Sequence, residues 1–269
     1  MKELINHITA QLETAYPKDE AQALAWWIVE EETGLTRSQL LCGCKDTTFS
    51  SHMQEIVSRL LHFEPIQYIF GHTSWNGLDL KVTPATLIPR PETAELVEKI
   101  INHKFEILNC RVLDIGTGSG CIAIAIKKAH PSWHVTGIDI SSEAIDVAKE
   151  NAKRNEVDVA FEVADIFDFN GDFDVVVSNP PYICECEKAG MRKNVLAYEP
   201  ATALFVPDDD PLKFYRKIAE LKMGKYLFFE INEAYPQELA LMLGELGYTD
   251  IQITNDIYDK PRIIEARVD

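Results

Sequence analysis

Apolar side chains recur at helical spacing in the first quarter of the chain. Two sets each define one face of a helix: Leu24, Trp27 and Ile28, then Met53, Ile56, Val57, Leu60 and Leu61. Thr36 and Gln39 have the spacing of a capping box ahead of Leu40 and Leu41. Such stripes are more typical of a bundle core than of a cofactor site. We therefore predict a small helical bundle without chemistry of its own, suited to holding a partner.

The pattern changes from Gly71 to Thr86, where Gly, Asn, aromatic and β-branched residues gather around Asn76-Gly77. Asn-Gly is a strong signal for a two-residue hairpin turn, and a plain surface turn without paired strands is the alternative. We therefore expect a β-hairpin here.

A segment with two prolines, Leu87-Ile88-Pro89-Arg90-Pro91-Glu92-Thr93, follows the hairpin. The prolines keep the chain extended, and Pro91 suits the first turn of a helix. The apolar face of that helix would be Leu96, Val97, Ile100 and Ile101. These changes predict a helical domain over residues 1–72, a hairpin linker over 73–87 and a larger domain over 88–269.

In the larger domain, short apolar runs alternate with amphipathic stretches. The expected strands are residues 111–115, 134–138, 157–163, 173–178, 226–231, 251–254 and 263–268. Helices are expected over 122–126, around Ala144 and Val147, up to about Leu221, and over 236–246. The alternation predicts an α/β fold with a parallel sheet covered on both faces and an antiparallel final hairpin. Residues 183–211 show little periodicity, which is common in substrate loops and lids.

The first strand of this domain runs into Gly116-Thr117-Gly118-Ser119-Gly120. Glycines let a backbone pass close to a ligand, and the following helix presents free N–H groups. A glycine-rich turn alone is weak evidence. A dinucleotide fingerprint would place its third glycine where Cys121 stands, so this spacing favours a cofactor without a pyrophosphate.

Acidic residues follow the next two strands. Asp139 is placed to accept hydrogen bonds from ribose hydroxyls, unless it only caps the next helix. The carboxylate of Asp165 could take an adenine amino group while Ile166 and Phe167 flank the ring. A capping Asp beside two core residues fits that second spacing equally well.

The fourth strand ends at Asn179-Pro180-Pro181-Tyr182. In open α/β sheets, ligands bind beyond the carboxyl ends of strands. The prolines stiffen the turn. The Asn179 side-chain carbonyl and the Pro180 backbone carbonyl then offer two acceptors for a planar NH2 group, and Tyr182 offers an aromatic face. Fixed acceptors align and polarise such a weak nucleophile, so we assign catalysis here, with a proline-terminated strand lacking chemistry as the alternative.

Composition restricts the partners. The chain has 269 residues, of which 46% are hydrophobic and 26% charged, as expected for an ordinary globular protein. Its formal charge of -17 argues against broad contact with nucleic acid and favours a basic protein partner, or serves solubility alone. No apolar run reaches membrane-span length and the N-terminus lacks a signal-peptide core, so we expect a cytoplasmic protein without membrane contact.

Six cysteines include two C-x-C pairs, Cys42 with Cys44 and Cys184 with Cys186, beside the separate Cys110 and Cys121. The usual zinc spacing is C-x2-C, so we expect reduced thiols and no metal.

Taken together, these residues resemble the HemK/PrmC family of protein-glutamine methyltransferases, which act on translational release factors. The matching stretches run in the family's order along nearly the whole chain: Glu64-Pro65-Ile66-Gln67-Tyr68, Leu87 to Thr93, Asp114 to Gly120, Asn179 to Tyr182, Glu199-Pro200 with Ala203-Leu204, and Pro261-Arg262. Asn-Pro-Pro-Tyr alone is shared with adenine methyltransferases of DNA. Its combination with Ile-Pro-Arg-Pro-Glu-Thr is highly specific.

The resemblance implies a helical recognition domain, a hairpin and a seven-stranded, Rossmann-like domain that uses S-adenosylmethionine. By analogy, Gly116 to Gly120 and Asp139 hold the cofactor, Asp165 to Phe167 border its adenine, and Asn179 contacts cofactor and substrate alike. Asn179 to Tyr182 would hold the glutamine of a Gly-Gly-Gln tip. The chain would work as a monomer. Ile166 departs from a frequent tryptophan, and Val206-Pro207 from a frequent Gly-Gly, which predicts a stiffer loop.

Two other functions use the same features. An adenine-specific DNA methyltransferase would use the same tetrad, but it needs a basic groove that this acidic chain does not suggest. A non-catalytic scaffold that senses S-adenosylmethionine for the translation machinery would not need the intact tetrad. Binding of duplex DNA and methyl transfer to a release factor discriminate among the three.

Overall fold

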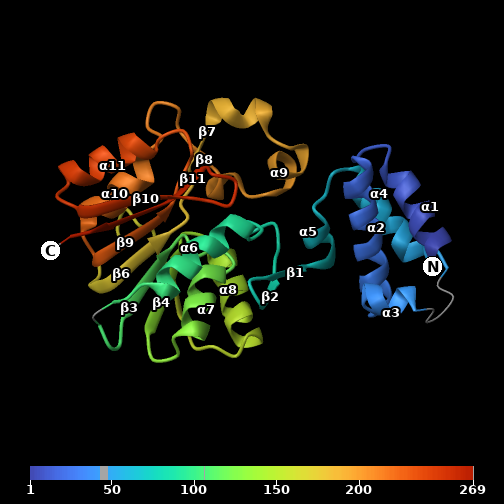
Figure 1. The fold of residues 1–269 in the computed structure, drawn as a ribbon, viewed down its shortest axis with the longest axis horizontal. Helices are drawn as coiled ribbons and strands as arrows, with labels where there is room; N and C mark the ends of the chain where they lie inside the picture. Colours follow the sequence, from blue (N-terminus) through green and yellow to red (C-terminus); the bar gives the residue numbers. More distant parts are fainter. Residues whose placement is uncertain (43–47, 106, 269) are drawn as a thin grey trace. The chain divides into compact units, whose positions relative to one another are not determined.

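The computed structural model describes residues 1–42, 48–105 and 107–268 (Figure 1). The chain forms two compact units. The first comprises Met1–Phe70 with Arg192–Tyr198, and the second comprises Gly71–Met191 with Glu199–Asp269.

The first unit is helical, as predicted. Its helices are α1 (Lys2–Leu12), α2 (Lys18–Thr33), α3 (Arg37–Leu41), α4 (Ser51–Leu61) and α5 (Ile66–Phe70). The predicted stripes supply the core: Ile28, Met53, Ile56, Val57 and Leu60 are buried, while Leu24, Trp27 and Leu61 pack at its edge. The capping box is confirmed, because Gln39 N donates to Thr36 Oγ1 at 3.4 Å and Thr36 N donates to Gln39 Oε1 at 2.9 Å.

One short helix of this unit comes from far along the chain. Helix α9 (Lys193–Tyr198) lies in the segment after the Asn179 tetrad, and the contacts of Arg192–Tyr198 place it with the N-terminal helices. Tyr198 Oη donates to the carbonyl of His62 at 3.1 Å, and Lys193 lies 5.1 Å from the ring centre of Phe63. A short segment that follows the Asn179-Pro180-Pro181-Tyr182 tetrad, Arg192–Tyr198, therefore belongs to the helical unit.

The second unit begins with the predicted hairpin. Strands β1 (His72–Trp75) and β2 (Leu78–Lys81) pair antiparallel, with Trp75 opposite Leu78. Asn76 and Gly77 have φ values of 45° and 73°, which fit a type I′ turn, so the Asn-Gly prediction is confirmed.

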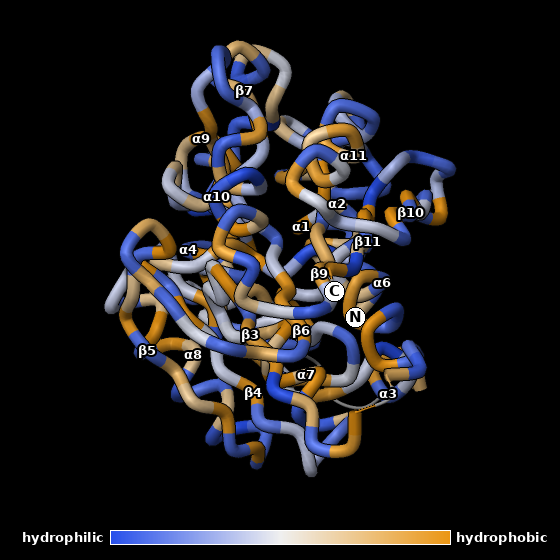
Figure 2. Tube along the Cα trace, turned by 90° about the vertical axis from the view of Figure 1, so that its left-hand side faces the viewer, coloured by the Kyte–Doolittle hydropathy of each residue, from blue (hydrophilic) through white to orange (hydrophobic). Residues whose placement is uncertain are grey.

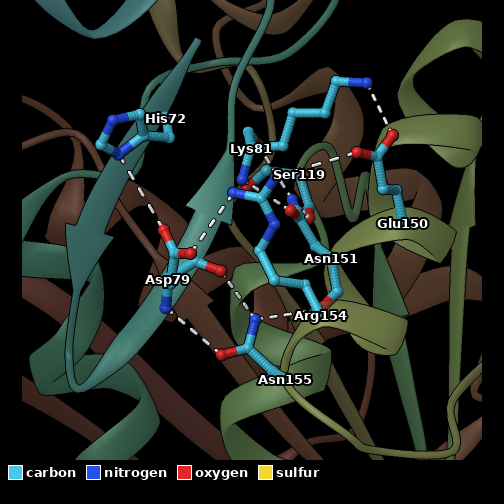
Figure 3. A network of polar contacts seen from close by, with 8 residues as sticks. All are labelled: His72, Asp79, Lys81, Ser119, Glu150, Asn151, Arg154 and Asn155. Carbon is cyan, nitrogen blue, oxygen red and sulfur yellow. Dashed lines mark hydrogen bonds and ion pairs between the residues drawn. The ribbon is translucent and has the colours of Figure 1, made fainter. Parts of the chain in front are cut away.

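The hairpin is tied to helix α8 (Ser142–Arg154) and the residue that follows it (Figure 3). Asn151 accepts from Lys81 N at 2.6 Å and donates to Lys81 O at 2.9 Å. One turn later, Asn155 accepts from Asp79 N at 3.2 Å and donates to Asp79 O at 2.8 Å. The two side-chain amides thus pair with the free backbone edge of β2 as a neighbouring strand would.

The centre of the unit is a seven-stranded sheet of order β10-β11-β9-β6-β3-β4-β5. The strands are β3 (Arg111–Ile115), β4 (His134–Asp139), β5 (Ala160–Val163), β6 (Phe173–Ser178), β9 (Gly224–Glu230), β10 (Thr249–Asn255) and β11 (Pro261–Arg267). Strand β11 pairs antiparallel with both β9 and β10, and the other pairs are parallel. This confirms the predicted α/β class, including the antiparallel end.

Alternating side chains build a core on each face of this sheet. Val112 and Val175 face α6 (Pro91–Asn102), α7 (Cys121–Ala129) and the hairpin. Leu113 and Val176 face α10 (Lys213–Leu221) and α11 (Pro236–Glu245). Helix α7 is buried over most of its length, and its tube is largely orange, for hydrophobic, in Figure 2.

The segment 183–211 holds more structure than its sequence suggested. Besides α9 it contains β7 (Ile183–Cys184), η1 (Glu185–Gly190), η2 (Ala201–Ala203) and β8 (Phe205–Val206), and β7 pairs parallel with β8. Each element has at most six residues, which is too short for periodicity to show.

Cys44 lies outside the described residues, and the five described cysteines, Cys42, Cys110, Cys121, Cys184 and Cys186, are unpaired. Within residues 1–42, 48–105 and 107–268, no helix is both long and apolar enough to cross a bilayer.

Candidate active site

A cavity of about 400 Å³ opens where β3, β4 and β6 end. Its wall brings together residues from all four predicted stretches: Gly116 to Ser119, Asp139, Asp165 to Phe167, and Asn179 to Pro181. The volume is in the range of small-molecule sites, and the position is the one favoured by open α/β sheets. Gly120 and Tyr182 are the predicted site residues that do not line this cavity.

The glycine turn is built to stay open. Gly116 and Gly118 have φ values of 69° and 53°, a region that residues with a Cβ rarely adopt. A Cβ at Gly116 would meet no atom within 4 Å, so the backbone faces free space there. Gly120 serves packing instead, because its Cβ would lie 3.1 Å from Ala148, Ile124 and Phe161.

Asp114, near the end of β3, stabilises this turn by hydrogen bonds. Its Oδ2 accepts from Thr117 Oγ1 at 2.6 Å and from Ala123 N at 3.3 Å, while Oδ1 is buried without a hydrogen-bond partner among the described residues. Burial raises the pKa of Asp114 to about 7, against the opposing effect of its hydrogen bonds. A group that keeps its proton near neutral pH therefore lies directly under the turn.

Asp139 is held at the end of β4 with its carboxylate facing the turn. Gly118 N donates to its Oδ2 at 2.9 Å and Ser141 N donates to its Oδ1 at 2.9 Å. The N-cap of α8 is Ser141, whose hydroxyl accepts from Ala144 N. The alternative prediction that Asp139 only caps this helix is therefore wrong. Burial raises the pKa of Asp139. Each carboxylate oxygen keeps a further lone pair for a ligand in the cavity.

The Asp165 segment forms another part of the cavity wall. Asp165 Oδ1 accepts from Phe167 N at 2.9 Å, a local turn that leaves Oδ2 available. Ile166 is buried and Phe167 is 39% exposed, so an apolar surface borders the carboxylate. Lys213 and Phe214 of α10 complete this wall, and neither was predicted from the sequence.

The tetrad presents two acceptors at the cavity. Asn179 Nδ2 donates to Thr93 Oγ1 at 3.3 Å, which leaves its Oδ1 without a partner among the described residues. The carbonyl of Pro180 likewise accepts no hydrogen bond within that part of the chain. The carbonyl of Tyr182, two residues further along, instead accepts from Asn232 Nδ2 at 3.0 Å.

Tyr182 is half-buried and packs against the core on the α10 side of the sheet. Its hydroxyl donates to Glu230 Oε1 at 3.1 Å, and burial raises its pKa. Tyr182 thus anchors the end of the tetrad to Glu230 and does not itself line the cavity.

One part of the cavity wall was not predicted from the sequence. The segment after the hairpin, with Thr86, Leu87, Pro89, Arg90 and Thr93, lines it, although we read that segment as an extended connection. Arg90 Nη2 donates to Glu199 Oε1 at 2.7 Å, and Ile88 N donates to Glu199 Oε2 at 3.3 Å. The paired prolines were the available signal, since they rigidify a chain that must hold a fixed path.

These residues fit S-adenosylmethionine. The open turn at Gly116 leaves room beside the backbone, Asp139 offers acceptors suited to a diol, and Asp165 offers one suited to an aromatic amine.

Comparison with known proteins gives the class. Residues 108–228 match the family model of the Methyltransferase domain, and residues 3–71 match the PrmC N-terminal domain. The catalytic domain of hMettl16 in complex with a MAT2A 3′UTR hairpin has a TM-score of 0.54 at 17% identity, over 84% of this chain and 85% of that chain. A methyltransferase from Pyrococcus furiosus has a TM-score of 0.52 at 19% identity, over 78% and 96%. These identities show the fold alone. With the family match, the chain is an S-adenosylmethionine-dependent methyltransferase.

Relatives of higher identity identify the family within this class. A release factor glutamine methyltransferase of Bacteroides thetaiotaomicron is 42% identical over 99% of both chains. Its namesakes from Flavobacterium psychrophilum and Streptococcus pneumoniae are 45% and 47% identical, over 79% and 80% of this chain and 79% and 73% of theirs. The chain belongs to the release factor glutamine methyltransferase family.

Proposed function

We propose that this enzyme transfers a methyl group from S-adenosylmethionine to the side-chain amide nitrogen of the glutamine in the Gly-Gly-Gln motif of a release factor. The observation that carries the proposal is a pair of acceptors, Asn179 Oδ1 and the Pro180 carbonyl, that belong to residues lining the cavity and have no hydrogen-bond partner among the described residues. A primary amide has two N–H donors in one plane, and two fixed acceptors match them.

The cofactor would lie along Gly116 to Ser119, with Asp139 on its ribose and the Asp165 to Phe167 wall on its adenine. When bound, it supplies an electrophilic methyl group. The other reactant, the amide nitrogen, is a weak nucleophile because it shares its lone pair with the carbonyl. The chain's own residues compensate for this. Asn179 Oδ1 and the Pro180 carbonyl hold both N–H bonds and stabilise the positive charge that develops on nitrogen.

Bond changes at the nitrogen balance simply. When bound, S-adenosylmethionine would supply the methyl group and keep the electrons of its carbon–sulfur bond on sulfur, and the amide nitrogen would release one proton to water after gaining the methyl group. No base in the chain is required, because the proton becomes acidic only after nitrogen has gained the methyl group. Tyr182 holds the corner in place from behind.

Mass spectrometry of release-factor peptides, after incubation with the enzyme and S-adenosylmethionine, tests the proposal. We expect a single added methyl group on the glutamine of Gly-Gly-Gln. Duplex DNA and a release factor with Gly-Gly-Ala serve as parallel substrates and should stay unmodified. Methylation of DNA adenine alone would favour the rival enzyme, and binding without any transfer would favour the scaffold.

A further inference from the structure

The acceptor role of Asn179 depends on how its amide is turned. An asparagine amide presents oxygen on one side and NH2 on the other, and the two orientations fill nearly the same volume. With its NH2 toward the cavity, Asn179 would oppose the N–H bonds of a substrate amide. Something in the fold must select the productive orientation.

A buried hydrogen-bond chain runs away from Asn179 to the end of the neighbouring strand. Asn179 Nδ2 donates to Thr93 Oγ1 at 3.3 Å, and Thr93 Oγ1 donates to Glu230 Oε2 at 2.6 Å. Thr93 is 3% exposed and Glu230 is 1% exposed. Because Ser178 of β6 is in register with Phe229 of β9, Asn179, which follows β6, comes next to Glu230, the last residue of β9.

Donor counting fixes the direction of this chain. An ionised carboxylate only accepts, so the single hydrogen of Thr93 goes to Glu230. Thr93 can then meet Asn179 only as an acceptor, and Asn179 must offer its NH2. The Asn179 oxygen is thereby turned away from Thr93 and stays available to a ligand in the cavity that Asn179 lines.

We propose that Glu230 is a positioning residue that acts through Thr93 to hold the amide of Asn179 with its oxygen toward the substrate. The proposal rests on the proposed function, since it assigns the orientation that binding a glutamine amide requires. The second oxygen of Glu230 accepts from Tyr182 Oη at 3.1 Å, so one carboxylate braces both ends of the tetrad.

The charge on Glu230 is what directs the chain. Burial raises its pKa, while the hydroxyls of Thr93 and Tyr182 and the charge of Arg262 on β11 oppose that rise. Glu92 on α6 adds to it. Burial and, in turn, the charge of Glu230 raise the pKa of two further titratable groups: the Cys121 thiol at the start of α7 and the Tyr215 hydroxyl of α10, which donates to the Glu230 backbone carbonyl at 2.9 Å. A protonated Glu230 would donate to Thr93, free the Thr93 hydrogen for Asn179, and reverse the amide.

The test compares Thr93→Val, which removes the hydroxyl at similar volume, with Thr93→Ser, which keeps it. We expect Thr93→Val to lower kcat on a release factor by about 10- to 100-fold, with cofactor affinity within about threefold of wild type. Thr93→Ser keeps the hydroxyl, so its kcat should stay within about threefold of wild type. Equal kcat for Thr93→Val and wild type, or an equal fall in both variants, would overturn the proposal.

A second variant covers a failure of Thr93→Val to fold. Tyr182→Phe removes one donor from Glu230, so the pH at which kcat falls on the acid side should rise relative to wild type. A merely structural role of the hydroxyl would lower kcat without moving that pH, and this outcome would count against the proposal. Wild-type enzyme inactive on every release factor would instead refute the proposed function, which separates the two failures.

Discussion

Arg90 and Glu199 form an ion pair at 2.7 Å that joins segments 109 residues apart. The Glu199 side chain is 1% exposed and that of Arg90 is 32% exposed, so the carboxylate depends on its partner for compensation. Both residues adjoin the cavity wall, Arg90 directly and Glu199 through Pro200. The ion pair therefore holds the segment around Glu199, which follows the tetrad, against the segment around Arg90, which follows the hairpin.

Removing this cation should destabilise the fold. Among the described residues, Arg90→Ala leaves the buried Glu199 carboxylate with the Ile88 amide as its one donor. We expect a loss of about 2 kcal/mol in the free energy of unfolding after discounting for the exposure of Arg90. The matched control is Lys260→Ala, which breaks the exposed pair with Glu233 and should cost less than about 1 kcal/mol. Urea unfolding measures both, and equal losses would contradict this account.

Asn179→Ala removes one of the two acceptors proposed for the substrate amide. We expect kcat to fall by about 100-fold or more, as for the loss of one transition-state hydrogen bond, while cofactor binding stays measurable. Single-turnover methylation and calorimetric titration with S-adenosylmethionine separate the two effects. Undiminished turnover would refute the assigned role.

Asp139→Ala tests the proposed cofactor wall. Loss of a charged acceptor should weaken binding of S-adenosylmethionine by about 10- to 100-fold. Glu143→Ala removes a nearby carboxylate of α8 that does not line the cavity, and its affinity should stay within about threefold of wild type. Calorimetry on both variants checks the expectation, which fails if the two bind equally well.

The hairpin should support the glycine turn through Asn151. Its Nδ2 donates to Ser119 O at 2.8 Å as well as to Lys81 O, and the residue is fully buried (Figure 3). Asn151→Ala should cost about 2–3 kcal/mol of stability and weaken cofactor binding, because it strands buried backbone groups. Asn155→Ala breaks the matching contact at the exposed Asp79 and should leave cofactor affinity unchanged. A similar loss of affinity in both would show that Ser119 is not the connection.

Asp114 should make stability depend on pH. Its pKa is about 7 in the folded protein against an ordinary value of 3.8, so between these values the folded state keeps a proton that the unfolded state releases. Stability contributed by this group is therefore lost as pH rises, by at most about 1.4 kcal/mol per pH unit, and levels off above about pH 7. Asp114→Asn stays neutral throughout. The difference in unfolding free energy between wild type and Asp114→Asn should therefore shift against wild type between pH 3.8 and about 7, and a constant difference would exclude the raised pKa.

The elements of the fold were largely predictable because their signals are local. The strand Phe173–Ser178 coincides with its apolar run, the turn at Asn76-Gly77 requires the φ values that those residues tolerate, and Pro91 does begin a helix. Strand β5 begins at Ala160, later than the predicted Val157, because pairing with β4 and not composition sets where a strand starts. The short elements of 183–206 carried no readable period.

The sequence by itself determined the succession of strands and helices along the chain and the residue types at the carboxyl ends of the strands, since hydrophobic period and turn chemistry act between near neighbours. Only the tertiary structure decided that Thr93 meets Asn179 across 86 residues and Glu230 across 137. That meeting depends on the register of β6 with β9 and on the packing of α6, which arise when the whole sheet buries both faces at once. No local pattern encodes such a register, so the acceptors of the site were visible in the sequence and the hydrogen-bond chain that orients one of them was not.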